Sequence, residues 1–174
     1  MQQPPNPISW DTTIVIGQFI TLPGGQGPGF SYTWTPTTNL SCTNCSTPVY
    51  NGTVNATFIE TIADNRGCFK AQSTFTIDIL PEASIAVPTA FTPNGDGKND
   101  IVFVAGWGIK SLLYFKIFNR WGELVFQSED INVGWDGTYK GVPQNIETYV
   151  YEASVLSYIS DKPLTKKGYI NLLR

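Results

Sequence analysis

The chain has 174 residues, a net charge of −3 and no histidine, and only 14% of its residues are charged. The lack of histidine excludes His-based acid–base catalysis, Ser-His-Asp triads and most zinc-hydrolase sites, and the acidic balance gives no reason to expect nucleic-acid binding. Frequent β-branched and aromatic residues with 16 Gly and 12 Pro are typical of an all-β protein, and no apolar run approaches the roughly 20 residues of a membrane-spanning helix.

Residues 1–81 read as short strands separated by turns. A first strand is expected within Asp11–Leu22, before a Gly-rich loop. Further along, alternation places Phe58, Glu60 and Ile62 on one face of a strand. Strands that recur about every 8–12 residues, with a Trp in the middle of the segment, predict an Ig-like β-sandwich.

Three cysteines lie in this first half. Cys42 and Cys45 are three positions apart, but no βαβ pattern and no second Cys pair surround them, so a redox or zinc-binding CxxC is not expected. We expect a local Cys42–Cys45 disulfide, whose short loop adds little stability. The alternative is a bond from Cys68 to one of these two, which would tie two strands together.

The composition changes near residue 81 and predicts two domains, 1–81 and 82–174, each large enough for one modest core. The join between them, PEASIAVP, is too short to act as a flexible tether. We therefore expect two tandem Ig-like antiparallel β-sandwich domains.

A loop follows the join, with the sequence PTAFTPNGDGKND at Pro88–Asp100. Its two central glycines allow positive φ, so oxygens of Asn94, Asp96, Asn99 and Asp100 converge in a tight turn. One interpretation is a site for a hard cation such as Ca²⁺, although the spacing lacks the final bidentate Glu of an EF-hand. The other interpretation is an Asx-rich turn whose side chains accept hydrogen bonds from backbone N–H groups. Both stay open at this point.

The segment SLLYFKIFNRWGELVF, residues 111–126, predicts a β-hairpin. Alternation puts Leu113, Phe115 and Ile117 on one face of its first strand. Asn119–Gly122 suits a type I turn, with Asn at the first position and Gly at the last.

Two further strands are expected at Thr148–Leu156 and Tyr169–Leu173, so that the last strand pairs within a sheet instead of fraying. Trp121, Trp135 and Arg120 invite comparison with a carbohydrate platform or a cation–π site. The favoured interpretation is that both Trp side chains anchor the core or the hairpin, with Arg120 stacked across one of them.

Five motifs follow one another in order: PTAFTPNGDGKND, NRWGELVF at Asn119–Phe126, GWDGTYKG at Gly134–Gly141, ETYVYEA at Glu147–Ala153 and GYINLLR at Gly168–Arg174. This ordered set resembles the type B C-terminal sorting domain of the type IX secretion system, also called the gliding-motility-associated C-terminal domain, over residues 85–174. The sequence departs from that family around Glu147-Thr148, where a Gly is usual. Residues Ser9–Leu80 resemble the PKD-like or Ig-like repeats that precede such domains in large surface proteins.

The resemblance implies a folded export signal and not an enzyme. It implies passage through the periplasm to the medium or to the outer-membrane surface. The implied partners are the type IX translocon, its shuttle component and a PorP/SprF-like outer-membrane protein. The residues expected to be recognised belong to the motifs: Asn94, Asp96, Arg120, Trp121, Asp136, Tyr169, Ile170, Leu172 and Arg174.

A precursor exported in this way needs a signal peptide. The first ten residues, MQQPPNPISW, lack the charged segment and the apolar segment of such a peptide. We therefore expect an excised fragment, or a numbering that begins after a cleaved region. The alternative, which the composition leaves open, is a cytoplasmic protein.

Two other classes of function are weighed against export. One is a calcium-stabilised carbohydrate-binding or adhesive module, and the other is a structural Ig-like spacer, which the density of motifs in the last half disfavours. Paired carboxylates such as Asp96 and Asp100 can in principle hydrolyse glycosides. A Gly-rich turn beside a small core lacks the deep cleft that such an enzyme needs, so catalysis is not expected.

Overall fold

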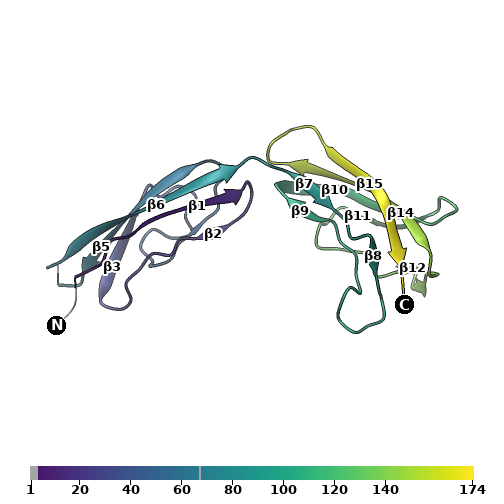
Figure 1. Ribbon diagram of the computed structural model, residues 1–174, viewed down its shortest axis with the longest axis horizontal. Coiled ribbons are helices and arrows are strands. Elements are labelled where there is room, and N and C mark those ends of the chain that lie inside the picture. Colours follow the sequence, from purple (N-terminus) through teal and green to yellow (C-terminus); the bar gives the residue numbers. More distant parts are fainter. Residues whose placement is uncertain (1–3, 67) are drawn as a thin grey trace. The chain divides into compact units, whose positions relative to one another are not determined.

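In a computed structural model, described for residues 4–66 and 68–174, the chain forms two compact units, Met1–Pro81 (unit 1) and Glu82–Arg174 (unit 2). These described residues hold fifteen strands and no helix, which confirms the expected all-β class (Figure 1). Nothing in the described ranges has the length and hydropathy of a membrane-spanning helix.

Unit 1 contains a four-stranded sheet in the order β1-β6-β5-β3 and a two-stranded sheet, β2-β4. β1 runs parallel to β6, whereas the other pairs are antiparallel. The single strand expected within Asp11–Leu22 is divided in two, because the chain turns at Gly17, whose φ is 83°. The strands are β1 (Ser9–Val15), β2 (Ile20–Thr21), β3 (Phe30–Thr35), β4 (Val49–Tyr50), β5 (Ala56–Asp64) and β6 (Lys70–Leu80).

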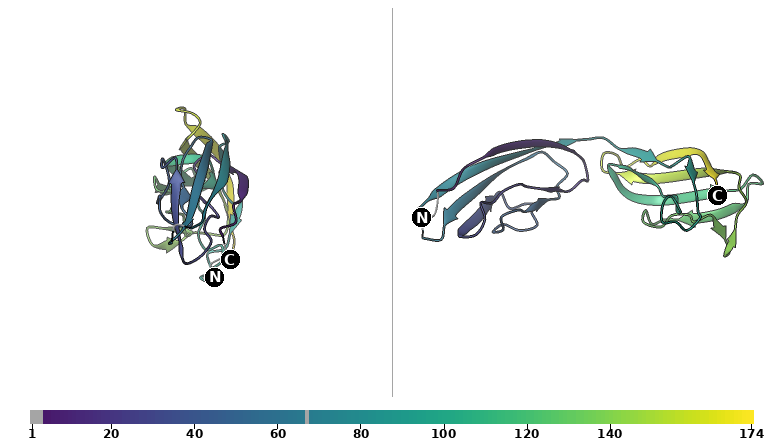
Figure 2. Two further views of the ribbon diagram at one scale, coloured as in Figure 1. Left: turned by 90° about the vertical axis from the view of Figure 1, so that its left-hand side faces the viewer. Right: turned by 60° about the horizontal axis from the view of Figure 1, so that its bottom comes forward.

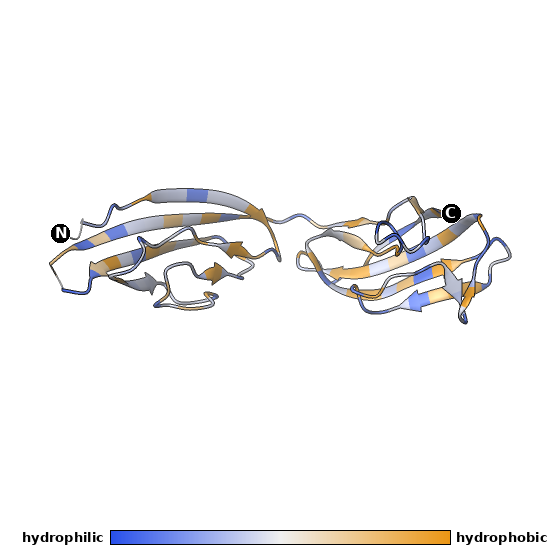
Figure 3. Ribbon diagram, turned by 90° about the horizontal axis from the view of Figure 1, so that it is seen from below, coloured by the Kyte–Doolittle hydropathy of each residue, from blue (hydrophilic) through white to orange (hydrophobic). Residues whose placement is uncertain are grey.

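The core of unit 1 is built around Trp34, which is fully buried and whose ring centroid lies 4.9 Å from that of Phe75. Polar and apolar residues alternate along the long strands of the sheet (Figure 3). On β5 this alternation buries Phe58 and Ile62, as expected, and it buries Glu60 with them.

Unit 2 contains a five-stranded sheet in the order β11-β10-β14-β15-β8, with two small sheets, β7-β9 and β12-β13 (Figure 2). β15 is antiparallel to β14 on one side and parallel to β8 on the other. The strands are β7 (Ser84–Ala86), β8 (Ala90–Phe91), β9 (Ala105–Trp107), β10 (Ile109–Phe118), β11 (Leu124–Ser128), β12 (Thr138–Tyr139), β13 (Val142–Pro143), β14 (Thr148–Ser157) and β15 (Leu164–Leu172).

The expected pattern of β10 is wrong at one position. The register between β10 and β14 shifts between Leu112 and Tyr114, so that Leu113 is an extra, bulged residue. As a result Leu112, and not Leu113, is buried with Phe115 and Ile117.

The core of unit 2 combines side chains of the five-stranded sheet with residues from outside it. Phe115, Tyr149 and Ile170 come from the sheet, and Val102 and Trp135 come from the irregular segments. Backbone hydrogen bonds of 2.9 Å in both directions join Val102 to Trp135 and hold these two segments together.

Candidate functional site

Three of the five motifs meet at Trp135. The side chain of Trp135 is 1% exposed, and its ring centroid lies 5.3 Å from that of Phe91 and 4.7 Å from that of Tyr149. Its indole Nε1 donates a hydrogen bond of 2.8 Å to the carbonyl oxygen of Thr138, so the polar atom of the buried ring is satisfied. Trp135 is therefore a core anchor, as the favoured interpretation of the sequence had it.

Gly137 brings the terminal motif to the same place. A Cβ atom at Gly137 would lie 2.9 Å from Pro93 and 3.1 Å from Leu172, and the φ of Gly137 is 79°. Both the space and the backbone conformation favour glycine there. The loop after Phe91, the GWDG motif and the last strand thus pack against one another at one end of unit 2.

Hydrogen bonds within the loop occupy its carboxylates. Asp100 Oδ1 accepts bonds from the N–H groups of Asn94 (2.9 Å) and Gly95 (2.7 Å), and its Oδ2 accepts one from Gly97 (2.7 Å). These bonds, with that of Gly95 the largest influence, hold the pKa of Asp100 below its usual value. Asp96 Oδ1 accepts a bond of 2.8 Å from the N–H of Lys98.

This geometry favours the Asx-turn interpretation of the loop, because backbone N–H groups of the loop already bond to the oxygens that would ligate a cation. Asn94 Oδ1 accepts a bond of 3.0 Å from the N–H of Asp96, and Asn99 has a φ of 54° that carries the chain out of the turn. In the described ranges no group of three or more Asp, Glu, Cys or His side chains could hold a metal.

The hairpin between β10 and β11 is capped by Asn119. The Gly122 N–H donates to the Asn119 carbonyl at 2.9 Å, which closes the expected four-residue turn. Asn119 Oδ1 also accepts bonds of 3.0 Å from the N–H groups of Trp121 and Glu123. The tip of the hairpin is thus fixed by its own side chain.

This rigid tip presents Trp121, which is 80% exposed, so the expectation that both Trp side chains are anchors is wrong for Trp121. The guanidinium of Arg120 lies 5.1 Å from the Trp121 ring centroid, and its Nε lies 3.3 Å from Glu147 Oε2. The Arg120–Glu147 pair occurs at the position where the sequence departs from the family motif. Glu147 also accepts, through its carbonyl oxygen, a 3.0 Å bond from the N–H of Leu172.

Tyr149 lies close to Glu147, the ion-pair partner of Arg120. Its hydroxyl donates a hydrogen bond of 2.9 Å to the Asn145 carbonyl. Burial, followed by the nearby carboxylate of Glu147, raises the pKa of Tyr149 to about 12. Tyr149 is therefore a neutral structural side chain at physiological pH and not a proton-transfer group.

Two of the residues expected to be recognised must be corrected. Ile170 is 0% exposed and Leu172 is 1% exposed, because both point into the core from β15. Their side chains cannot contact a partner while the unit is folded. Tyr169, at 57% exposure, faces solvent on the same strand, and Arg174 is exposed beyond it.

Asp136 is exposed, but its side chain is engaged locally. Asp136 Oδ1 accepts bonds from the Thr138 N–H at 2.9 Å and from the Thr138 hydroxyl at 2.8 Å. Asp136 therefore stabilises the turn that carries Trp135.

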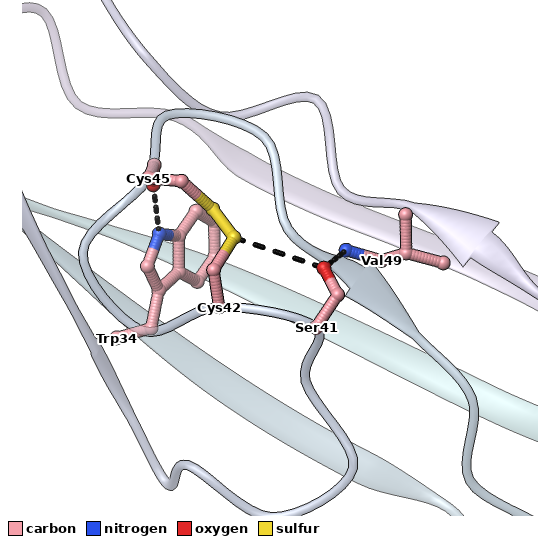
Figure 4. Close-up of a disulfide and its surroundings, with 5 residues drawn as sticks. All are labelled: Trp34, Ser41, Cys42, Cys45 and Val49. Atoms are coloured by element: carbon pink, nitrogen blue, oxygen red, sulfur yellow. Dashed lines mark hydrogen bonds between the residues drawn. A yellow bond between two sulfur atoms is a disulfide. The ribbon is translucent and has the colours of Figure 1, made fainter.

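In unit 1 a disulfide joins Cys42 and Cys45, and Cys68 is a free, exposed thiol. The disulfide loop covers the core, since the Cys45 carbonyl accepts a bond of 2.9 Å from Trp34 Nε1 (Figure 4). The Cα atoms of the two cysteines are 5.9 Å apart. The loop therefore anchors the indole of unit 1 much as Thr138 anchors the indole of unit 2.

Comparison with known proteins gives one family. The model of the CHU_C type IX secretion signal domain matches residues 85–172. No curated protein matches the chain.

Solved structures with some similarity have low identity. The N-terminal four Ig domains of Dscam1 isoform 4.4 are 10% identical (TM-score 0.33, 99% of this chain and 44% of that one), so the chain spans less than half of that structure. A chimeric titin Z1Z2 is 11% identical (TM-score 0.46, 95% of this chain and 93% of that one). Three N-terminal domains of the bacteriophage RB49 outer capsid protein Hoc are 15% identical (TM-score 0.34, 91% of this chain and 55% of that one). Likenesses this distant carry no argument about function.

The family match covers half of the chain and includes the residues that meet at Trp135, from Phe91 to Leu172. It confirms the resemblance seen in the motifs. The chain belongs to the family of type IX secretion signal domains.

Proposed function

We propose that unit 2 is an export address that the type IX machinery reads only after the unit has folded. The observation that carries this proposal is the burial of the terminal motif. β15 is hydrogen-bonded to β14 and to β8, and Ile170 and Leu172 are at most 1% exposed. A linear tag would need to be accessible as an extended segment, and this one is part of a core.

The recognition surface that we propose consists of the exposed residues of the motifs: Asn94, Asp96, Arg120, Trp121, Asp136, Tyr169 and Arg174. Trp121 is the strongest candidate among them, since it is 80% exposed and is held on a turn that Asn119 fixes. Aromatic and Arg side chains commonly carry most of the binding energy of an interface.

We assign this recognition to the outer membrane. The resemblance to type B domains supports three partners: the translocon, its shuttle component and a PorP/SprF-like outer-membrane protein. The cargo would end at the cell surface or in the medium. Unit 1 would be an Ig-like spacer within a large surface or gliding-associated protein. Binding and folding suffice for this role, so we propose that the chain is not an enzyme.

Export of a reporter tests the proposal. The whole chain is fused behind a reporter with a signal peptide, in a host that has the type IX system and a matching PorP/SprF-like protein. We expect the reporter at the surface or in the medium, and in the periplasm when the translocon is deleted. The control fusion ends at Pro81 and carries unit 1 alone. Equal export of this control would contradict the assignment.

A calcium-stabilised carbohydrate-binding or adhesive module is the second candidate. One observation favours it, namely the exposed Trp121 ring with Arg120 beside it. A glycan array probed with the intact chain separates the two functions. Tight sugar binding that is lost in Trp121→Ala would favour the adhesive module over the export signal.

A further inference from the structure

The solvent-facing side of the five-stranded sheet carries one row of apolar side chains. Phe118 pairs with Leu124 on β11 and with Val150 on β14, and Val150 pairs in turn with Tyr169 on β15. Directly paired residues lie side by side on the same face of a sheet. These four side chains, which we call the apolar row, therefore cross four strands and extend for about 14 Å at the usual strand spacing.

The apolar row does not belong to the core. Leu124, Val150 and Tyr169 are 38%, 52% and 57% exposed. Along β14 the neighbours of Val150, Tyr149 and Tyr151, are both buried, so Val150 points away from the core. Single exposed apolar residues are ordinary, whereas a contiguous exposed set calls for an explanation, of which a binding surface is one.

The same face is polar on either side of the apolar row. Thr148 and Asn171 lie on one side, where the Thr148 hydroxyl donates a bond of 2.7 Å to Asn171 Oδ1. On the other side the paired residues Lys116, Glu152 and Lys167 form what we call the charged row. A solvated sheet face is expected to be polar throughout. The levels of this face directly next to the apolar row are thus polar.

The charged row has one cation in excess. Glu152 Oε1 lies 3.3 Å from the Nζ of Lys167 and accepts a bond of 3.1 Å from the hydroxyl of Tyr114. Lys116 lies over the ring of Tyr114, with its Nζ 4.8 Å from the centroid. In the described part of the chain, no carboxylate is within ion-pair distance of Lys116. The border of the apolar row therefore suits a carboxylate from outside.

We propose that the apolar row is the docking surface for a protein of the export machinery, which contributes an apolar strip with a carboxylate that faces Lys116. The proposal rests on the export function proposed above and names the chemistry of the partner. A second copy of the chain fits less well, because it brings the same excess of one cation, and its Glu152 is already engaged by its own Lys167.

Two valines make a matched pair for the test. Val150 is in the apolar row and is 52% exposed, and Val142, on β13 outside the row, is 61% exposed. In the reporter fusion of the whole chain, Val150→Lys is expected to lower the exported fraction about ten-fold or more, since it puts a cation in the centre of the interface. Val142→Lys is expected to leave export unchanged, and Val150→Ile is expected to retain it. Melting curves of the purified variants show that each is folded.

The outcomes separate the two proposals. If the wild-type fusion is exported and Val150→Lys is exported equally well, the docking surface is wrong and the export function stands. If the wild-type fusion is not exported, the export function itself fails. If Val150→Lys unfolds, the Lys116→Glu variant is the test instead, because it keeps the apolar row and reverses only the charge at the border of the row. Lower export of this folded variant supports the docking surface, and unchanged export overturns it.

Discussion

Glu60 is the residue of unit 1 whose environment least suits its charge. It is 1% exposed, and only one of its oxygens has a hydrogen bond, from the Gly25 N–H to Oε1 at 2.9 Å. Oε2 has no partner among the described residues. Burial raises the pKa of Glu60, against the smaller effects of Gly25 and Ser73. The sequence contained this signal, since alternation put Glu60 on the face of Phe58 and Ile62.

Glu60→Gln is predicted to gain stability, relative to wild type, as the pH rises. The pKa of Glu60 in the fold is above its unfolded value of about 4.3. The wild-type protein is therefore fully stabilised by protonated Glu60 below that pH, and it loses this stabilisation as the pH rises through the folded pKa, whereas Gln does not titrate. Urea unfolding at pH 4 and pH 7 should show a relative gain of about 1–3 kcal/mol, the range for a buried unpaired polar group. The control is the exposed Asp78→Asn. If the difference in unfolding free energy between Glu60→Gln and wild type did not depend on pH, burial would not raise the pKa of Glu60.

Asp100→Asn is predicted to lower the melting temperature at pH 7. The amide cannot accept all three N–H bonds that the carboxylate accepts. Because the pKa of Asp100 is lowered in the fold, its stabilisation is present above the unfolded value of about 3.9 and is lost as the pH falls through the folded value. The difference from wild type should therefore shrink in acid. Asp161→Asn, in an exposed turn of the same unit, is the control.

Chelator is predicted to leave the melting curve of the chain unchanged. The oxygens of the Asn94–Asp100 loop are engaged by its own N–H groups, so the loop has no need of an ion. A drop in melting temperature with chelator, absent in Asp96→Ala, would restore the calcium interpretation.

At the scale of elements, alternation and turn chemistry were sufficient to predict the longer strands, the hairpin turn at Asn119 and the pairing of the last strand, but not short strands such as β7 and β12. They could not predict partners that are distant in sequence, such as the parallel pairing of β1 with β6. The bulge at Leu113 was also beyond the pattern, because it depends on the fit of β10 to β14. For β15 the sequence does contain the information, because alternation alone puts Tyr169 and Ile170 on opposite faces of the strand.

The candidate site, like the strands, was predicted only in part. The motifs identified the segments that meet at Trp135, whereas the apolar row was missed. Its members belong to four different strands, and only the registers of Phe118 and Val150 bring them side by side. No periodicity within one segment contains that information.

The disulfide loop of unit 1 is predicted to leave one free thiol in the oxidised chain. Labelling followed by peptide mapping should find it at Cys68. Cys42→Ser with Cys45→Ser should lower the free energy of unfolding by no more than about 2 kcal/mol, since the entropic value for so short a loop is small beside that of a long one. Three free thiols in protein prepared under oxidising conditions would contradict this connectivity and weaken the assignment to an exported protein.

At the scale of the whole molecule, each unit has a separate core centred on a buried Trp. Trp34 and Trp135 are 0% and 1% exposed, and each donates its indole N–H to a backbone carbonyl, at 2.9 Å and 2.8 Å. Replacing either with Ala should destabilise its own unit by about 3–5 kcal/mol. The two substitutions are therefore equivalent in chemistry and differ in which unit they damage.

The exported fraction of the whole-chain reporter fusion, compared between Trp34→Ala and Trp135→Ala, tests the central claim most directly. If the folded unit 2 is the address, Trp135→Ala should hold the reporter in the periplasm, although every exposed motif residue is still present. Trp34→Ala should be exported like the wild-type fusion. Export of Trp135→Ala at the wild-type level, with its unit 2 shown to be unfolded, would contradict the account and indicate a linear signal.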